Sequence, residues 1–288
     1  MRIVPISAGY ELLISNCDLA HKLTEAPLRS SVRSRVLIAP VVAALLGGIA
    51  SASPGVAATA SRHVKTGAAV QIADVHCKVG VLLHQGKTVY AGVPASCGAL
   101  PLNEGVPQWG CGPKPGRQAA ASAPVGTPVR IAGAKHRALL AYDSFTRMQA
   151  KGILKNNPCQ YNDLILLKLT KADSKAARST VKSVMANAPS SGTSLRLGTA
   201  SATAAASTHN GWVYPLSKAP TVTASQVGTP LTRGSTLIGM LTAIPQGTIM
   251  KTPAAAYNLS RAIKMASHAP CVHGVVRACF NHLKLLKG

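Results

Sequence analysis

The chain has 288 residues, of which 31 are Lys or Arg and only eight are Asp or Glu, so its formal net charge is +23. The length allows one large domain or two small ones, and the charge favours polyanionic surroundings such as an anionic cell-surface polymer. Aromatic residues make up 3% of the chain, which leaves few platforms for stacking bases, so nucleic-acid binding is not expected.

Residues 1–60 read as a leader with an export signal. A basic flank, the short apolar run VLIAPVVAALLGGIA (36–50) and an Ala-Thr-Ala site (58–60) follow one another, which is the order of parts in such signals. The run is shorter than the ~20 residues of a membrane helix, so a cleaved signal is favoured over a retained anchor. We expect a secreted or cell-surface protein, with a folded domain over 61–288 and no transmembrane segment after cleavage.

Cys17 falls in the leader, which leaves six of the seven cysteines for the folded domain. An even number in an exported chain indicates disulfides, and several pairings are possible. We prefer the local set, in which Cys77 pairs with Cys97, Cys111 with Cys159, and Cys271 with Cys279. The cysteines lack the close spacing of zinc ligands, so neither a metal nor another cofactor is expected.

Short apolar runs separated by Gly, Pro, Asn and Ser turns predict an all-β domain. Strands are expected at 77–83, 88–93, 128–134, 136–145 and 163–169 in a first half (61–170), and at 193–201, 210–216 and 235–244 in a second half (193–252). Residues 98–126 read as a loop and 171–192 as a polar, partly helical connector. Pro253 and a period near 3.6 predict a helix over 253–269, and 270–288 forms a tail. Paired barrels and a single larger sandwich both fit this pattern.

The segment YNDLILLKL (161–169) places Asp163 at the mouth of a wholly apolar strand. A buried carboxylate needs a partner, because an unpaired charge in the interior costs several kilocalories per mole. The ordinary alternative is a carboxylate that caps a turn before a strand.

The order of three segments resembles the trypsin-like, chymotrypsin-fold serine peptidases, above all the small exported bacterial ones. In that family a strand ends in Ala-Ala-His-Cys, an Asn-Asp-Ile-Ala-Leu-Leu type strand follows, and Gly-Asp-Ser-Gly-Gly-Pro precedes a Val-Gly-Ile type strand. Here TVYAGVPASC (88–97), YNDLILLKL and ASQVGTPL (224–231) occur in the same order. The resemblance covers roughly 75–267 and implies two antiparallel β-barrels with a C-terminal helix.

Carried over residue by residue, the resemblance implies that most of the catalytic chemistry is absent. Ser96 stands at the position of the family's general-base histidine, Asp163 at that of the orienting aspartate, and Val227 at that of the nucleophilic serine. Cys77 and Cys97 match the cysteines of the family's disulfide beside the histidine.

The rest of the loop departs from the family pattern as well. Ser225 replaces an oxyanion-hole glycine, Gln226 replaces the aspartate beside the nucleophile, Gly228 falls on a glycine, and Thr229 replaces the last glycine. Thr221 lies near the expected base of the primary specificity pocket, where a neutral side chain would not select Lys or Arg.

Acyl transfer in this family needs a hydroxyl nucleophile, an imidazole and an orienting carboxylate. A valine has no proton or lone pair to contribute, and a serine cannot act as a base near neutral pH. Losing either group alone costs on the order of 10⁶-fold in turnover. We therefore predict a catalytically inactive homologue that binds a peptide or protein. The alternatives are a basic cell-surface protein that binds a polyanion, and an active serine endopeptidase with unrecognised catalytic residues or a shifted loop alignment.

Overall fold

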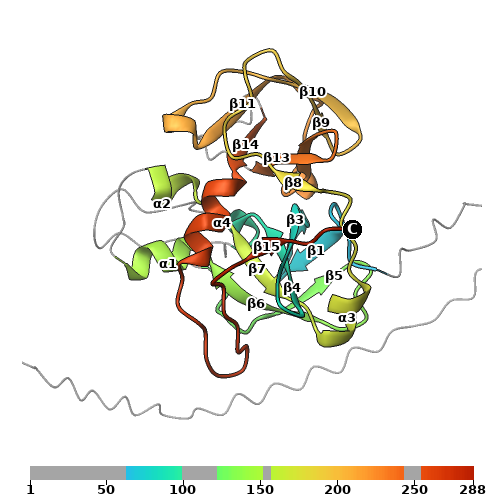
Figure 1. Cartoon of the computed structure of the whole chain (residues 1–288), viewed down its shortest axis with the longest axis vertical. Helices are drawn as coiled ribbons and strands as arrows, with labels where there is room; N and C mark the ends of the chain where they lie inside the picture. Colours follow the sequence, from blue (N-terminus) through green and yellow to red (C-terminus); the bar gives the residue numbers. More distant parts are fainter. Residues whose placement is uncertain (1–62, 99–121, 152–156, 243–253) are drawn as a thin grey trace, which may run out of the picture. The chain divides into compact units, whose positions relative to one another are not determined.

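The computed structural model describes residues 63–98, 122–151, 157–242 and 254–288, which all belong to one folded unit, Val56–Gly288 (Figure 1). The expected leader and Cys111 lie outside these ranges. Within them, no helix is long and apolar enough to cross a membrane.

The first sheet gathers the strands of the N-terminal half. It contains β1 (Ala69–Ile72), β2 (Val75–Lys78), β3 (Val81–Gln85), β4 (Thr88–Val93), β5 (Pro128–Ile131), β6 (Ala138–Asp143) and β7 (Ile165–Lys168), with β15 (Lys284–Leu285) at one edge. Its order is β15-β3-β4-β7-β6-β5-β1-β2. Strand pairing does not close this sheet into a ring, so the sheet is a half-barrel. The chain itself crosses the gap between the two ends, because β2 continues into β3 through Val79 and Gly80. Their amides donate to Ala68 O and Gly92 O at 2.8 and 2.9 Å.

The second sheet closes into a six-stranded barrel. It contains β9 (Ser194–Leu197), β10 (Ala200–Ala204), β11 (Val213–Lys218), β12 (Pro230–Arg233), β13 (Thr236–Thr242) and β14 (Ala255–Asn258), and β8 (Ser183–Val184) runs parallel to β13. The order β12-β9-β10-β11-β14-β13 closes through the β12–β13 pairing. With β2 and β3 counted as one bent strand, both sheets have the same order: first, second and third strands, then sixth, fifth and fourth. The prediction of two antiparallel barrels is confirmed.

The apolar strand β7 shows how the core is built. Ile165 and Leu167 lie in the interior of the first barrel, whereas Leu164 and Leu166 pack on the opposite side with Leu259 of the C-terminal helix. Both faces of the segment are therefore buried, which explains why no polar residue alternates along it.

Short helices fill the connections. They are α1 (Ser144–Ala150), α2 (Asn157–Tyr161), α3 (Lys171–Ala176) and α4 (Leu259–Ser267), with 3₁₀ turns η1 (Ala95–Gly98), η2 (His209–Gly211) and η3 (Ala224–Gln226). The expected connector at 171–192 contains α3 and β8. The expected strand over 136–145 ends at Asp143, where α1 follows it.

The prediction of a helix over 253–269 is confirmed for Leu259–Ser267 and wrong for Ala255–Asn258, which form β14 between β11 and β13. All four residues of β14 are buried, and a short apolar run of this kind has no periodicity that separates a strand from a helix. Asn258 marks the boundary, because its side chain accepts a hydrogen bond from Arg261 N and caps α4.

The C-terminal segment is an integral part of the first sheet rather than a loose tail. Lys284 and Leu285 pair with β3, and the buried ring of Phe280 lies 5.7 Å from that of Tyr90 and 5.5 Å from that of Tyr142. Two of the three expected disulfides are present in the described residues, Cys77–Cys97 and Cys271–Cys279. The third, Cys111–Cys159, involves a residue outside them.

Candidate functional site

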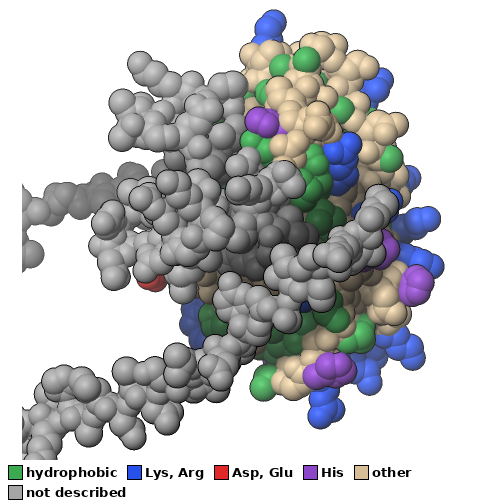
Figure 2. Space-filling view, turned by 90° about the vertical axis from the view of Figure 1, so that its left-hand side faces the viewer, with side chains coloured by type: hydrophobic (Ala, Val, Ile, Leu, Met, Phe, Trp, Pro, Cys, Tyr) green, Lys and Arg blue, Asp and Glu red, His purple; other side chains and the backbone are tan. Residues whose placement is uncertain are grey.

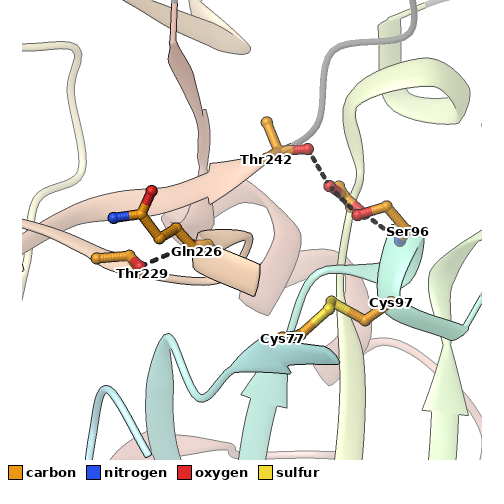
Figure 3. The surroundings of a disulfide bond; sticks show 7 residues. Cys77, Ser96, Cys97, Gln226, Thr229 and Thr242 are labelled. Atoms are coloured by element: carbon orange, nitrogen blue, oxygen red, sulfur yellow. Dashed lines mark hydrogen bonds between the residues drawn. A yellow bond between two sulfur atoms is a disulfide. The ribbon is translucent and has the colours of Figure 1, made fainter. Parts of the chain in front are cut away.

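Asp163, which lies just before β7, links one segment of each barrel through its partners Ser96 and Thr242, both labelled in Figure 3. Its Oδ1 accepts a hydrogen bond from Ser96 N, in the η1 turn after β4, at 2.9 Å. Its Oδ2 accepts one from Ser96 Oγ at a long 3.5 Å, and one from Thr242 Oγ1 at the end of β13. One carboxylate thus ties the first barrel to the second at the predicted triad position.

The environment of Asp163 is dry and already supplies its hydrogen bonds. The residue is 3% exposed, and burial raises the pKa of its carboxyl group, although hydrogen bonds from Thr242, Ser96 and the amide of Ala95 oppose the rise. None of these bonds comes from a histidine. In the described ranges every histidine is exposed except His84, which is half-buried. Asp163 therefore acts here as a structural acceptor between two hydroxyl-bearing neighbours.

The loop ASQVGTPL, which follows the exposed Thr221, closes on itself through its own polar groups. Gln226 Oε1 accepts a hydrogen bond from Thr223 N at 2.7 Å, and Gln226 O accepts one from Thr229 Oγ1 at 2.6 Å. Ser225 is exposed, and its hydroxyl contacts that of Thr223 at 3.0 Å. The amide side chain of Gln226 is thus engaged within the turn.

Val227 fastens this loop to the first barrel, and Gly228 fastens it to β13 of the second barrel. Lys78 N donates to Val227 O at 2.8 Å, and Gly228 N donates to Leu241 O at 2.7 Å. Gly228 has φ +88°, and a Cβ there would lie 2.1 Å from Lys78 O, so only glycine fits without a backbone shift. The Val227 side chain is 9% exposed and belongs to the same apolar cluster as Cys97, next to Ser96. The fold thus places the Val227 loop and the Ser96–Asp163 pair beside the same disulfide, Cys77–Cys97.

Two polar residues at or near the site, Thr242 and Asp143, were not identified as functional candidates from the sequence. Thr242 ends the run STLIGMLT, and nothing in a strand-terminal threonine marks it as a partner of Asp163. Asp143 is a second buried carboxylate, 4% exposed, whose Oδ1 accepts from Phe145 N at 2.8 Å and whose Oδ2 accepts from Ser122 Oγ. Burial raises the pKa of Asp143 to about 6, because the hydrogen bonds offset only part of the lost hydration and nearby Asp163 raises the value further.

A polar groove of about 730 Å³ lies on the Gln226 side of the loop. Lys78 and Thr66 of the first barrel line it, together with Gln226, Thr229 and Thr232 of the second. Its lining includes hydroxyl groups and one ammonium group but, among the described residues, no carboxylate. A metal site is not indicated either, because no cluster of three or more potential ligand side chains occurs in the described ranges.

The paired antiparallel barrels with one shared strand order and a C-terminal helix define a chymotrypsin-like fold, the fold of the trypsin-like serine peptidases. The assignment to this fold class is based on the strand topology.

No protein-family model and no curated protein matches the chain. Among solved structures, it is similar to Thermobifida fusca Protease A, with a TM-score of 0.45 and 12% identity over 78% of this chain and 100% of that one. It is also similar to a Nocardiopsis protease, with a TM-score of 0.43 and 12% identity over 70% and 96%. A third structure, of a glutamic acid specific serine protease, has a TM-score of 0.43 and 14% identity over 70% and 97%.

Proposed function

We propose that this chain is an exported, catalytically inactive homologue of the trypsin-like serine peptidases that acts by binding a peptide or protein. The observation that carries the proposal is the hydrogen bonding of Asp163, whose oxygens accept from Ser96 and Thr242 where the family's imidazole would bind. The disulfides Cys77–Cys97 and Cys271–Cys279 support an oxidising, extracytoplasmic location.

Proton transfer fails at both remaining triad positions. Ser96 is 2% exposed, so its hydroxyl has no access to a substrate, and it lacks the basicity to accept a proton near neutral pH. Val227 offers only methyl groups. The exposed hydroxyl of Ser225 contacts Thr223, another hydroxyl, which supplies no general base.

Peptide binding needs none of these groups. The Lys78–Val227 and Asp163–Thr242 hydrogen bonds hold the two barrels in a fixed arrangement, and an extended peptide can add to strand edges through its main chain alone. A preorganised surface of this kind lowers the entropy cost of binding. Thr221, exposed ahead of the loop, is the residue we assign to ligand selection, with a preference for uncharged side chains.

The catalytic half of the proposal is tested with the purified exported form, a fluorophosphonate probe and a casein substrate. We expect neither covalent labelling nor cleavage, with trypsin as the positive control for both reagents. Cleavage of casein that disappears in the Asp163→Asn variant would overturn the inactive assignment, because asparagine keeps an acceptor for Ser96 N but cannot replace the carboxylate of a working triad.

The binding half is tested by selecting ligands from a random peptide library and measuring their affinity for two variants. Thr221→Lys should weaken the selected peptides at least about tenfold, because an ammonium facing an uncharged side chain must lose hydration. Ser191→Lys, which adds the same charge at an exposed position between β8 and β9, should change little. Equal effects of both variants, or a library that yields no ligand, would contradict the proposed site.

A further inference from the structure

Three of the four acidic side chains that the structure describes are turned inward. In the described ranges Asp74 is exposed, whereas Asp143, Asp163 and Asp173 are buried. On the face shown in Figure 2, blue Lys and Arg side chains recur and far outnumber red acidic ones. On the part of the surface that the structure describes, few carboxylates are therefore available to neutralise the positive charge.

Asp173 organises one part of this surface. Its carboxylate, on α3, accepts hydrogen bonds from Lys135 N at 2.8 Å, His136 N at 3.2 Å and Thr170 Oγ1 at 2.7 Å, and it pairs with the His136 ring at 3.2 Å. Burial alone would raise the pKa of Asp173, but these bonds lower it below its usual value. The carboxylate is thus used to fix the turn between β5 and β6 against α3, and it faces away from solvent.

Cationic side chains from four segments lie around this fixed turn and α3. Lys135 and Arg137 come from the turn, Lys171 and Lys175 from α3, and Arg178 from the segment after α3. That segment pairs with the chain at Lys65, because Arg178 N donates to Val64 O at 3.0 Å. We call this the α3 basic surface; its members, all exposed, are Lys65, Lys135, Arg137, Lys171, Lys175 and Arg178.

Within the described part of the chain, none of these six side chains forms a salt bridge, since the only ion pair there is His136–Asp173. The Asp173 carboxylate among them is already paired with His136, so the six cations leave a strong local excess of positive charge.

We propose that the α3 basic surface is a docking site for a flexible linear phosphate polymer. Several fixed cations on a rigid scaffold match closely spaced phosphates, because each contact releases a counterion from the polymer. Every described Phe, Tyr and Trp is buried except the half-buried Tyr161, so stacking adds nothing for nucleic-acid bases. The exposed large apolar side chains of the described ranges, Val125 and Val275, lie outside the surface, which disfavours a lipid bilayer.

The test compares two quadruple variants that lose the same charge. One carries Lys135→Gln, Arg137→Gln, Lys171→Gln and Lys175→Gln. The control carries Arg196→Gln, Lys218→Gln, Arg233→Gln and Lys264→Gln, all exposed and on the second barrel or α4. Binding of inorganic polyphosphate is measured by fluorescence anisotropy at salt concentrations from about 50 mM to 500 mM, and circular dichroism verifies that both variants are folded.

Four lost phosphate contacts should reduce the slope of log K against log salt by about 3, and the affinity at 0.1 M salt by on the order of 10²–10³-fold. The control should retain most of the slope. Equal losses in both variants would show that binding depends on the general net charge and not on the α3 basic surface, which would overturn the proposal. So would tighter binding to single-stranded DNA or to anionic vesicles than to polyphosphate. The outcome is independent of the peptide-binding proposal, because Thr221 is unchanged in both variants.

Discussion

The buried carboxyl group of Asp143 should make the protein less stable as the pH rises from about 4 to 7. Burial raises its folded-state pKa from 3.8 to about 6, so between these values the folded state holds a proton that the unfolded state has released. Stability conferred by this proton is complete below pH 4 and is lost as the pH rises through 6. A shift of about two units corresponds to roughly 3 kcal/mol.

The variant Asp143→Asn should remove this pH dependence without disturbing the packing. The asparagine Oδ1 can still accept from Phe145 N and Thr146 N, as the aspartate does, and its amide can donate to Ser122 Oγ. We therefore expect the variant to equal or exceed the wild type in stability at pH 7, by up to about 3 kcal/mol.

Urea unfolding at pH 4, 5, 6 and 7 measures the effect, with the exposed Asp74→Asn as a matched control. The raised pKa of Asp163 acts in the same direction. The free energy of unfolding of Asp143→Asn should therefore still fall with rising pH, but less steeply than that of the wild type. The lowered pKa of Asp173 acts in the opposite direction and only below about pH 4. Parallel curves for wild type and Asp143→Asn would refute the reasoning, as would a variant strongly destabilised at pH 7.

Three further changes test the site and the fold. Ser96→His combined with Val227→Ser should give fluorophosphonate labelling, seen as a mass increase, that neither single change gives; a folded but unlabelled double variant would show that the triad correspondence is wrong. Gly228→Ala should lower the free energy of unfolding by more than about 3 kcal/mol, because strain at positive φ adds to a backbone clash. Gly234→Ala, with φ +58° and nothing within 4 Å of its Cβ, should cost only about 1–2 kcal/mol, and a similar loss at both glycines would refute the clash. Phe280→Ala should cost about 3–5 kcal/mol in urea unfolding, whereas a C-terminal segment irrelevant to stability would show no change.

The sequence was most informative where one residue type has one physical consequence. The wholly apolar run after Asp163 predicts a strand buried on both sides, and the structure shows Leu164 and Ile165 packed on opposite faces. The Gly-Lys turn after Gln85 predicts a hairpin, and β3 and β4 pair across it. Local sequence is sufficient for such elements because side-chain alternation and turn chemistry act over a few residues.

What the sequence could not provide depends on contacts between distant segments. Phe280 reads as part of a basic tail, yet its ring is buried beside Tyr90, almost two hundred residues away along the chain. Thr242 reads as one more strand residue, and only the approach of the two barrels makes it a partner of Asp163. The common strand order of the two barrels has no counterpart in a detectable sequence repeat, because topology constrains pairing order and not side-chain identity.

Asp163 illustrates why a residue that matches a catalytic position need not be catalytic. Its carboxylate accepts from Ser96 in the first barrel and from Thr242 in the second, so replacing it with alanine would leave buried donors unsatisfied at a cost of about 1–3 kcal/mol each. That structural requirement exists with or without an imidazole beside it. A stability loss in Asp163→Ala therefore says nothing about catalysis, whereas Asp163→Asn keeps an acceptor for the Ser96 amide. This difference makes asparagine the informative substitution at this position.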